Sequence, residues 1–443
     1  MPEPAPDDRA TRRNFRLGVL NGAIYQAGES FIDSSTVIPV FLSRLTGSHA
    51  LIGLASALND MGWLLPQMFV APWAARFPRQ IVIYRRAAVV RGAALAVLAA
   101  LIWPLSQHPA ALLTAFLACY TVFSLGAGFG GVAFMEVVGR TVPPRRLGSF
   151  WSQRLFWGGL GGAVAGLLVR EAMKIEDPGS RFALLFGVAA VVASSAYAMF
   201  SAIEEPDLPP ARAPSGTIAL LNEGLGMLRR DASLRRLLLS RAALSVWLTA
   251  SPFMVLFAVR DLGGGPRAAG TFLFARVAGF VLANLLWQPL SRAKGSRAIM
   301  CVATLTSSLL ALAAFGVALA SPWSLGFISA GVAVLLLEST AALGGAAQSG
   351  MLVGYASLVL ELAPRDRRQA FVSLANTFIG PTMLLPALGG ALVDWTNAPV
   401  VFALCSVAGL IGFRAALELP RAPAGESRIE QRAAAELVTG DEP

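Results

Sequence analysis

Long apolar stretches separated by short polar segments run through almost the whole sequence. Each is long enough for a helix to cross a hydrocarbon core of about 30 Å, which takes about 20 residues. Because the stretches are too uniformly apolar for the alternating strands of a barrel, they predict α-helices. We expect twelve of them, at 15–42, 50–75, 81–105, 110–138, 149–171, 181–203, 235–259, 267–291, 297–320, 323–362, 369–393 and 398–418.

A polar segment in the middle of the chain separates these stretches into two sets of six. It opens with EEPDLPPARAPSG, whose prolines and acids suit a solvated linker, and continues as TIALLNEGLGMLRR. The leucines of the second part are spaced for a helix lying along the membrane surface. We therefore expect a tail at 1–13, a six-helix bundle at 14–203, a linker with an interfacial helix at 204–234, a second six-helix bundle at 235–419 and a tail at 420–443.

Arginines mark one side of the predicted membrane. They concentrate in the N-terminal tail and in the loops after spans two, four, eight and ten, whereas the loops between these carry few. Lysine and arginine are enriched in cytoplasmic loops. The alternation predicts that both termini are cytoplasmic.

The composition agrees with a membrane protein. Of the 443 residues, 55% are hydrophobic and 14% charged, and the mean hydropathy is +0.62. A soluble domain carries about 25% charged residues. The net charge of +10 does not indicate nucleic-acid binding, because the arginines occur in short bursts between apolar segments. Lysines are few and alanines abundant, which favours a GC-rich bacterial gene and a multi-pass protein of the bacterial cytoplasmic (inner) membrane.

Catalytic and metal-binding patterns are missing from the sequence. Cys119, Cys301 and Cys405 are far apart within apolar runs, so they indicate neither a metal site nor a disulfide framework. There is no phosphate-binding loop, and His49 and His108 fall in predicted outer loops. We expect no enzymatic activity, no cofactor and no metal.

The two halves also repeat each other weakly. The segment closing span two, PWAARFPR, corresponds to PLSRAKGSR after span eight, with Pro72 matching Pro289. Paired bundles related in this way are a known transporter architecture. With two sets of six spans and a long central loop, residues 14–418 resemble the major facilitator superfamily.

That family carries a loop signature, roughly Gly-x-x-x-Asp-Arg-x-Gly-Arg, after spans two and eight. The second copy here keeps Arg292, Gly295 and Arg297, and the first keeps Arg76 and Arg79. Ser291 and Ala75 replace the acid, and Pro78 replaces the glycine of the first copy. The resemblance implies that these loops form the cytoplasmic gate, but loss of the acid leaves the gating pair open.

Span eleven holds small residues and prolines in the sequence IGPTMLLPALGG. Gly380 with Pro381, and Gly389 with Gly390, allow a kink and close helix packing. In family exporters a Gly-Pro signature lies in span five, which here has the glycines without the proline. We expect hinge or packing roles for these four residues.

Glu29 and Asp33 place two acids one helical turn apart in the first span. Such groups inside a membrane need a partner, water or a proton, and two of them resist simultaneous ionisation. The resemblance implies that span one lines the central cavity, so both are candidates for a proton or substrate site. Alternatively, Asp33 caps a helix break before Pro39, and Glu29 makes a structural hydrogen bond.

Four further charged residues lie within predicted spans. We expect Asp60 and Arg91 to form a structural ion pair inside one bundle, with a coupling site as the alternative. Glu338 is a possible partner of Arg276, which could instead bind substrate. The stretch 323–362 is about twice the length of one crossing. It should break near Gly344 and Gly345 or project past the outer surface, which would leave Glu338 in water.

These features predict a secondary active transporter that works by alternating access. Cavity acids with few bases beside them favour proton antiport, with efflux of a small amphipathic or cationic compound driven by the proton gradient. Proton-driven uptake of a small metabolite remains open, as does a non-transporting sensor or scaffold on the same fold. The expected partners are a small-molecule substrate, protons and the lipid bilayer, and we expect a monomer that binds no nucleic acid.

Overall fold

The structure is a computed structural model that describes residues 8–74, 76–206, 225–362, 371, 375 and 378–420. The described residues form helices and connecting turns, with no strand among them. The first half contains α1 (Asp8–Ser30), α2 (Val37–Leu42), α3 (His49–Ala74), α4 (Gln80–Ile102), α5 (Pro109–Thr141), α6 (Pro144–Ala172) and α7 (Pro178–Ser201).

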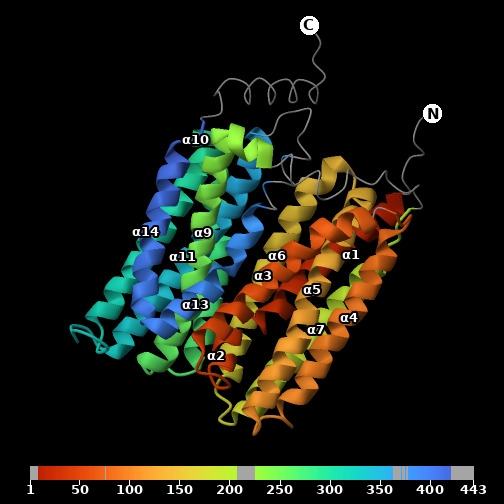
Figure 1. The fold of residues 1–443 in the computed structure, drawn as a ribbon. Coiled ribbons are helices and arrows are strands. Elements are labelled where there is room, and N and C mark those ends of the chain that lie inside the picture. The colour runs from red at the N-terminus through yellow and green to blue at the C-terminus, as the bar shows by residue number, and fades with distance from the viewer. Residues whose placement is uncertain are drawn as a thin grey trace.

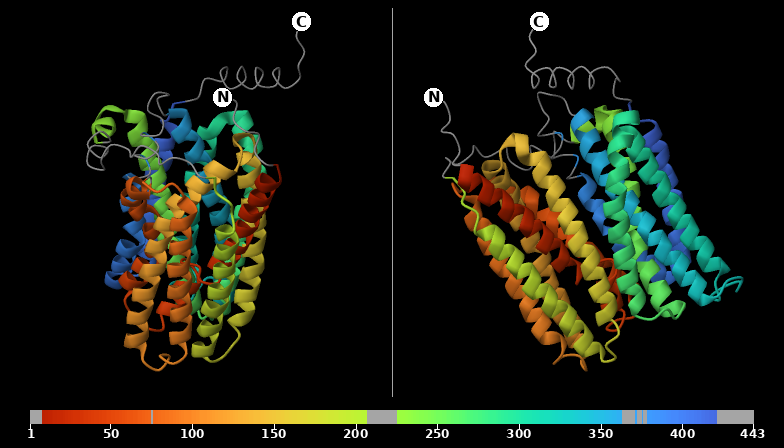
Figure 2. Two further views of the ribbon diagram at one scale, coloured as in Figure 1. Left: turned by 90° about the vertical axis from the view of Figure 1, so that its right-hand side faces the viewer. Right: turned by 180° about the vertical axis from the view of Figure 1, so that it is seen from behind.

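The second half contains α9 (Ala232–Leu256), the π-helix η1 (Phe257–Asp261), α10 (Arg267–Ala320), α11 (Ala330–Leu362), the 3-10 helix η2 (Gly380–Leu384), α13 (Leu385–Trp395) and α14 (Ala398–Leu417). Each half forms its own bundle, and the two bundles lie side by side (Figures 1 and 2). The start of α1 and the end of α14 lie at the same end of the molecule (Figure 1). We call this end, which the arginine pattern predicts to be cytoplasmic, the inner end and the opposite one the outer end.

Several helices have the length and composition of membrane spans. Within the described ranges, seven segments qualify: Pro109–Thr141, Pro178–Ser201, Ala232–Asp261, Arg267–Ser291, Ala293–Ala320, Ala330–Val359 and Ala398–Leu417. The other expected spans of the first half, 15–42, 50–75, 81–105 and 149–171, coincide with α1 and α2, α3, α4 and α6. Part of the expected interfacial helix is helical, at 225–230; its earlier residues and most of the first half of the expected span 369–393 lie outside the described residues.

The first expected span, 15–42, is not one continuous helix. α1 ends at Ser30 and α2 begins at Val37, so residues 31–36 interrupt it. The Asp33 carboxylate accepts hydrogen bonds from the Ser35 amide and hydroxyl (3.1 and 2.7 Å) and from the Thr36 hydroxyl (2.9 Å). Such local bonds compete with helical ones. The break therefore follows the capping interpretation of Asp33.

One expectation about the second half is contradicted by the helix boundaries. The helix α11 runs without interruption through Gly344 and Gly345, so the predicted break there is wrong. A Cβ at Gly345 would lie 1.9 Å from the Arg276 carbonyl oxygen, so this glycine permits close packing on α10. The helix α10 itself folds back at Gly295, whose φ of 77° is a conformation that glycine readily adopts.

The most extensive contacts between the bundles are those of α3 with α13 and of α6 with α10. At the first, a Cβ on Gly53 would lie 2.0 Å from the Pro386 carbonyl oxygen, and one on Gly390 2.0 Å from that of His49. These glycines therefore let the helices approach closely. Gly380 and Pro381 open the 3-10 turn that leads into α13, and Gly389 packs against Thr249.

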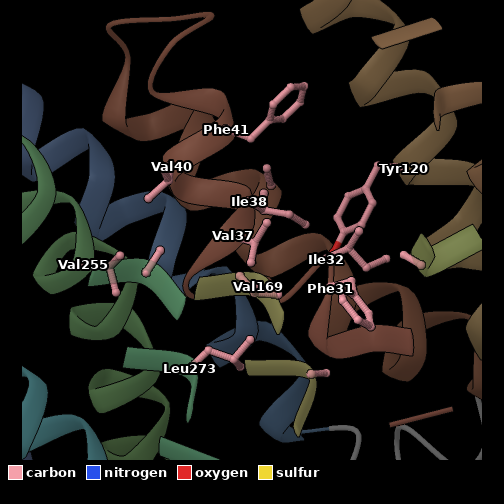
Figure 3. Packing of buried hydrophobic residues seen from close by; sticks show 14 of the residues in the cluster. Phe31, Ile32, Val37, Ile38, Val40, Phe41, Tyr120, Val169, Val255 and Leu273 are labelled. Atoms are coloured by element: carbon pink, nitrogen blue, oxygen red, sulfur yellow. The ribbon is translucent and has the colours of Figure 1, made fainter. Parts of the chain in front are cut away.

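An apolar core lies where the bundles meet. All six residues of α2 are buried. Figure 3 shows Val37 and Ile38 beside Val169 of α6, with Val255 of α9 and Leu273 of α10 in the same cluster. The broken first span is thus packed between the two bundles, which positions Asp33 at their interface.

Candidate functional site

Asp33 forms an ion pair between the two bundles. Its Oδ1 atom caps the break in the first span, and its Oδ2 atom binds the Arg276 guanidinium of α10. The two side chains are 15% and 20% exposed. The partners are 243 residues apart in the chain. Any movement that separates the bundles here must break this pair.

Arg276 has one further partner. Its Nη1 atom donates to Gln348 Oε1 on α11 at 3.3 Å. Its Nε atom is buried and has no hydrogen-bond partner among the described residues. Arg276 is therefore held by Asp33 from one bundle and by Gln348 from its own.

Glu29 is paired within the first bundle. Arg91 of α4 donates from Nη2 to Glu29 Oε1 at 3.2 Å, and from Nε to the Phe123 carbonyl at 3.1 Å. The Arg91 guanidinium also lies over the rings of Phe123 and Tyr197, at 4.3 and 4.9 Å from their centroids. With the Arg91 side chain only 7% exposed, this pair is enclosed by aromatic residues.

Two predicted partnerships are therefore wrong. Arg91 binds Glu29 and not Asp60, and Arg276 binds Asp33 and not Glu338. Glu338 is half-buried on α11, where the charge acting most strongly on it is that of Arg170. Sequence position alone gave no means of choosing among acids and arginines on different helices.

Asp60 and Arg241 are a third pair of opposite charges, but they do not touch. Asp60 lies on α3 and Arg241 on α9, so they belong to different bundles. Arg241 instead reaches the Ser245 hydroxyl of its own helix at 3.4 Å, and its guanidinium lies over the Tyr355 ring. Arg241 was not among the charged residues singled out from the sequence.

We call these six residues the central charged cluster: Glu29, Asp33, Asp60, Arg91, Arg241 and Arg276. The cluster contains three carboxylates and three guanidiniums, contributed by both bundles. The expectation of acids with few bases beside them is therefore wrong. The charges balance, which removes the reason for preferring a cationic substrate.

The described residues of the loop signature lie in different surroundings. Arg297 donates to the carbonyls of Ala416 and Leu417 at the end of α14, so it binds within its own bundle. Gly295 makes the reversal in α10. Arg76 is exposed and Arg79 precedes the first turn of α4, while the Arg292 side chain lies outside the described part of the structure.

Glu205 belongs to the segment 204–234, whose first part was predicted to be a solvated linker. For Glu205 that prediction is wrong. Its side chain is fully buried, and it binds Arg140 Nη1 at 2.9 Å and the Ile81 amide at 2.7 Å. Arg140 also donates to the Pro78 carbonyl at 2.7 Å. Glu205 thus supplies a carboxylate beside the loop whose own signature acid is replaced by alanine.

Asp394 joins the bundles at the outer end of the molecule. Its carboxylate accepts hydrogen bonds from the amides of His49 (2.8 Å) and Ala50 (3.0 Å), at the start of α3. The His49 ring lies 2.7 Å from it, and the Ser48 hydroxyl 3.3 Å. We call this contact the outer clasp. Burial opposes ionisation of Asp394, but the hydrogen bonds from Ala50 and His49 outweigh it and hold the pKa below its usual range.

Among known protein families, one matches part of this chain. The family model of the major facilitator superfamily matches residues 237–440. No curated protein sequence matches the chain. The resemblance noted from the sequence is thereby confirmed in the second half of the chain.

Solved structures extend the likeness to the whole chain. A POT family transporter in complex with 5-aminolevulinic acid has 13% identity and a TM-score of 0.65, covering 92% of this chain and 96% of its own. A D-xylose-proton symporter has 14% identity and a TM-score of 0.65, covering 94% and 98%. An inward-facing bacterial homologue of the iron transporter ferroportin has 14% identity and a TM-score of 0.66, covering 91% and 99%. The chain therefore has the fold of these membrane transporters.

Proposed function

We propose that this chain is a multi-pass membrane protein of the major facilitator superfamily, and that it is a proton-coupled secondary transporter and not an enzyme. Its twelve spans, with both termini cytoplasmic, form two bundles that rock about the central charged cluster. The protein works as a monomer in a bacterial inner membrane, with the proton gradient as its energy source and no cofactor. The fold shared with solved transporters supports this proposal.

The contact that carries the proposal is the one between Asp33 and Arg276. It joins the bundles inside the apolar region, where a carboxylate without a partner is costly. When the bundles separate, Asp33 loses Arg276, and a proton can then neutralise it. Arg276 and the proton therefore compete for one carboxylate, so each favours a different state of the transporter.

Glu29 is a weaker candidate for the coupling proton than the sequence suggested. Arg91 belongs to the same bundle as Glu29, so rocking of the bundles leaves that pair intact. Arg91 therefore stays beside Glu29 in both states, and Glu29 makes no contact with the described residues that changes as the bundles move. We assign the coupling proton to Asp33 and a structural role to Glu29.

The proton step serves efflux and uptake equally. When the outer side is open, Asp33 can take up a proton from outside; when that side closes, Arg276 displaces it toward the inside. Inward proton movement can drive a substrate either way. We retain efflux as the first candidate and uptake as the second, while a sensor or scaffold would have no need of an exchangeable proton at Asp33.

The proposal is tested by the distance between the outer ends of the bundles. Spin labels at Gln107 and Ser324, both in exposed outer turns, report this distance in a background without the native cysteines. Acidification from pH 8 to pH 5 should shift the wild-type distribution toward longer distances. Asp33→Asn should give the long distances at both pH values, because the ionic bond to Arg276 is absent.

Glu29→Gln is the matched control, four residues away in the chain. It removes a pair that does not cross between the bundles, so its distances should follow those of the wild type. A pH response that survives in Asp33→Asn, or that disappears in Glu29→Gln alone, would show that Asp33 is not the coupling group.

A further inference from the structure

A pocket of about 190 Å³ lies at the outer end of the second bundle. Its base is apolar and buried, with Phe253 of α9, Phe257 of η1 and Val393 of α13 among its members. Its rim is exposed and includes Asp261 and Trp323. An engineered apolar cavity of about 150 Å³ holds one benzene molecule. The pocket therefore has room for one aromatic ring with a short substituent.

The pocket is separate from the central charged cluster. All six residues of that cluster lie in the described part of the chain, and none of them lines the pocket. Asp261 ends η1, and Trp323 lies in the turn between α10 and α11, so both belong to outer turns. A ligand can thus reach the pocket from outside without passing the central charged cluster.

The π-helix η1 shapes one wall of the pocket. The Leu262 amide donates to the Phe257 carbonyl, five residues earlier, at 3.0 Å. With this wider turn, Phe257 and Asp261 both line the pocket. Single π-turns are rare in proteins and are frequent at functional sites. The end of this helix therefore places an aromatic ring and a carboxylate beside one cavity.

Asp261 gives the rim of the pocket a negative charge. Its carboxylate has neither a hydrogen bond nor an ion pair among the described residues. Arg260, its neighbour in the chain, is not among the described residues that line the pocket. A positively charged group that enters the pocket would thus meet a carboxylate that no other described cation binds.

Aromatic rings supply further walls. Trp323 packs edge-on against Phe257 with 5.8 Å between the ring centroids, and the His49 ring lies 6.4 Å from that of Phe253. Aromatic faces attract ammonium groups and also pack against other rings. Because His49 Nδ1 lies 2.7 Å from Asp394, that carboxylate would balance a proton on His49. The site therefore favours a cationic ligand over an anionic one.

We propose that this pocket binds a small aromatic monocation, with its ammonium group at Asp261 and its ring against the apolar base. An anion would be repelled by Asp261, and a neutral ring would gain nothing from the carboxylate. The proposal gives the protein a second binding site, distinct from the place where the bundles exchange the coupling proton.

Binding at this site should hold the outer ends of the bundles together. Of the described residues that line the pocket, only His49 belongs to the first bundle, and the outer clasp holds it there. Opening of the outer end would carry His49 away and remove one wall of the pocket. A ligand that contacts this wall therefore favours the closed outer end. This regulatory effect, unlike the binding itself, rests on the proposed function.

Thermal unfolding of the purified full-length protein tests the binding. The probes are phenethylamine, which is a cation at neutral pH, its neutral analogue phenethyl alcohol, the anion phenylacetate, and ethylamine, which lacks the ring. Phenethylamine should raise Tm with an apparent Kd about tenfold lower than that of phenethyl alcohol, because a hydrogen bond to a charged group contributes about this factor. Phenylacetate and ethylamine should not raise Tm at the same concentrations.

Substitutions then assign the parts of the probe to the pocket. Asp261→Asn should abolish the preference for the amine over the alcohol, and Trp323→Leu should weaken the binding of both. Because Asp261 and Trp323 are exposed, neither change should prevent folding. Loss of a preference is also a readout that general destabilisation does not produce. Glu176→Gln removes an exposed acid from an outer turn of the first bundle and should leave the wild-type preference unchanged.

Spin labels at Gln107 and Phe327 test the effect on the bundles, since Ser324 is adjacent to Trp323 in the chain. Both labelled positions are exposed in outer turns, and the background lacks the native cysteines. In Asp33→Asn at pH 8, which should keep the outer end open, phenethylamine should shift the distances toward shorter values. The shift should be absent when Asp33→Asn is combined with Asp261→Asn.

Three results would refute the proposed pocket. These are binding of phenethyl alcohol or phenylacetate as tight as that of phenethylamine, an unchanged preference in Asp261→Asn, or no rise in Tm with any probe. Selective binding without a change of distance would refute the regulatory effect. If Asp33→Asn shows no long distances even without a probe, the proposed function fails instead, and the unfolding data still decide whether the pocket binds the cation.

Discussion

Glu29 and Asp33 are acids four residues apart in the chain, and their surroundings give them different roles. Glu29 faces Arg91 inside a rigid bundle, whereas Asp33 faces Arg276 across the contact between bundles. Removing one member of a buried pair costs about 3–5 kcal/mol, because the other charge remains without compensation. The same chemistry therefore stabilises one bundle in the first case and holds two bundles together in the second.

Glu205 gives a prediction at the level of a single residue. Glu205→Gln removes the charge that faces Arg140 and keeps an oxygen that can accept the Ile81 hydrogen bond. We expect it to lower the free energy of unfolding by about 3 kcal/mol, since the carboxylate is fully buried. Denaturant titration in detergent micelles measures this change.

The neighbouring acid is the control for that measurement. Glu204 pairs with Arg13 at the surface, with side chains 69% and 47% exposed. Glu204→Gln should therefore change the free energy of unfolding by less than about 1 kcal/mol. Equal effects of the two substitutions would show that burial of Glu205 does not contribute as described.

The sequence showed which charged residues lie in apolar stretches more readily than it showed which of them pair with each other. Intramembrane acids and arginines stand out in apolar runs, so Glu29, Asp33, Asp60, Arg91 and Arg276 were all found. Their pairing depends on which helix faces which, and partners such as Asp33 and Arg276 are far apart in the chain. Glu205 was missed because its linker sequence is typical of exposed segments.

At the level of helices, the outer clasp connects the end of α13 to the start of α3. The first amides of a helix lack partners within it, and Asp394 accepts two of them from the other bundle. Because the pKa of Asp394 is depressed, its contribution is present above the ordinary aspartate pKa of about 3.9 and is lost only when pH falls through the lower, folded-state value.

The Asp394 carboxylate of the outer clasp should therefore remain ionised between pH 8 and pH 5. Asp394→Asn should lengthen the Gln107–Ser324 distance across this whole pH range, because the capping charge is lost. Asp177→Asn is the matched control: Asp177 also caps a helix and has a lowered pKa, but it does so within the first bundle. Equal shifts in both variants, or none in Asp394→Asn, would refute the role of the clasp.

The positions of the helices could be predicted from the hydrophobic runs, because a membrane span must form the hydrogen bonds of its backbone N–H and C=O groups within itself. Helix interruptions followed less well. The Asp33 break depends on hydrogen bonds from Ser35 and Thr36, a signal present in the local sequence. The unbroken path of α11 through Gly344 and Gly345 depends on packing against α10, which no local sequence reports.

For the whole molecule, the division into two bundles determines which charged pairs can break when the protein changes conformation. Contacts between α3 and α13 and between α6 and α10 join the halves, and the Asp33–Arg276 pair and the outer clasp lie on the same contact surface. The two-bundle architecture was predictable from the number of spans and the arginine pattern. The charge balance at the centre was not, because it needs the depth and the facing direction of each residue.

The central claim is that the Asp33 carboxylate alternates between Arg276 and a proton. Infrared difference spectra between pH 5 and pH 8 detect this directly, through the carbonyl stretch of a protonated carboxyl group. We predict a band that is present in the wild type, retained in Glu29→Gln and lost in Asp33→Asn. A band that persists in Asp33→Asn and disappears in Glu29→Gln would contradict the account.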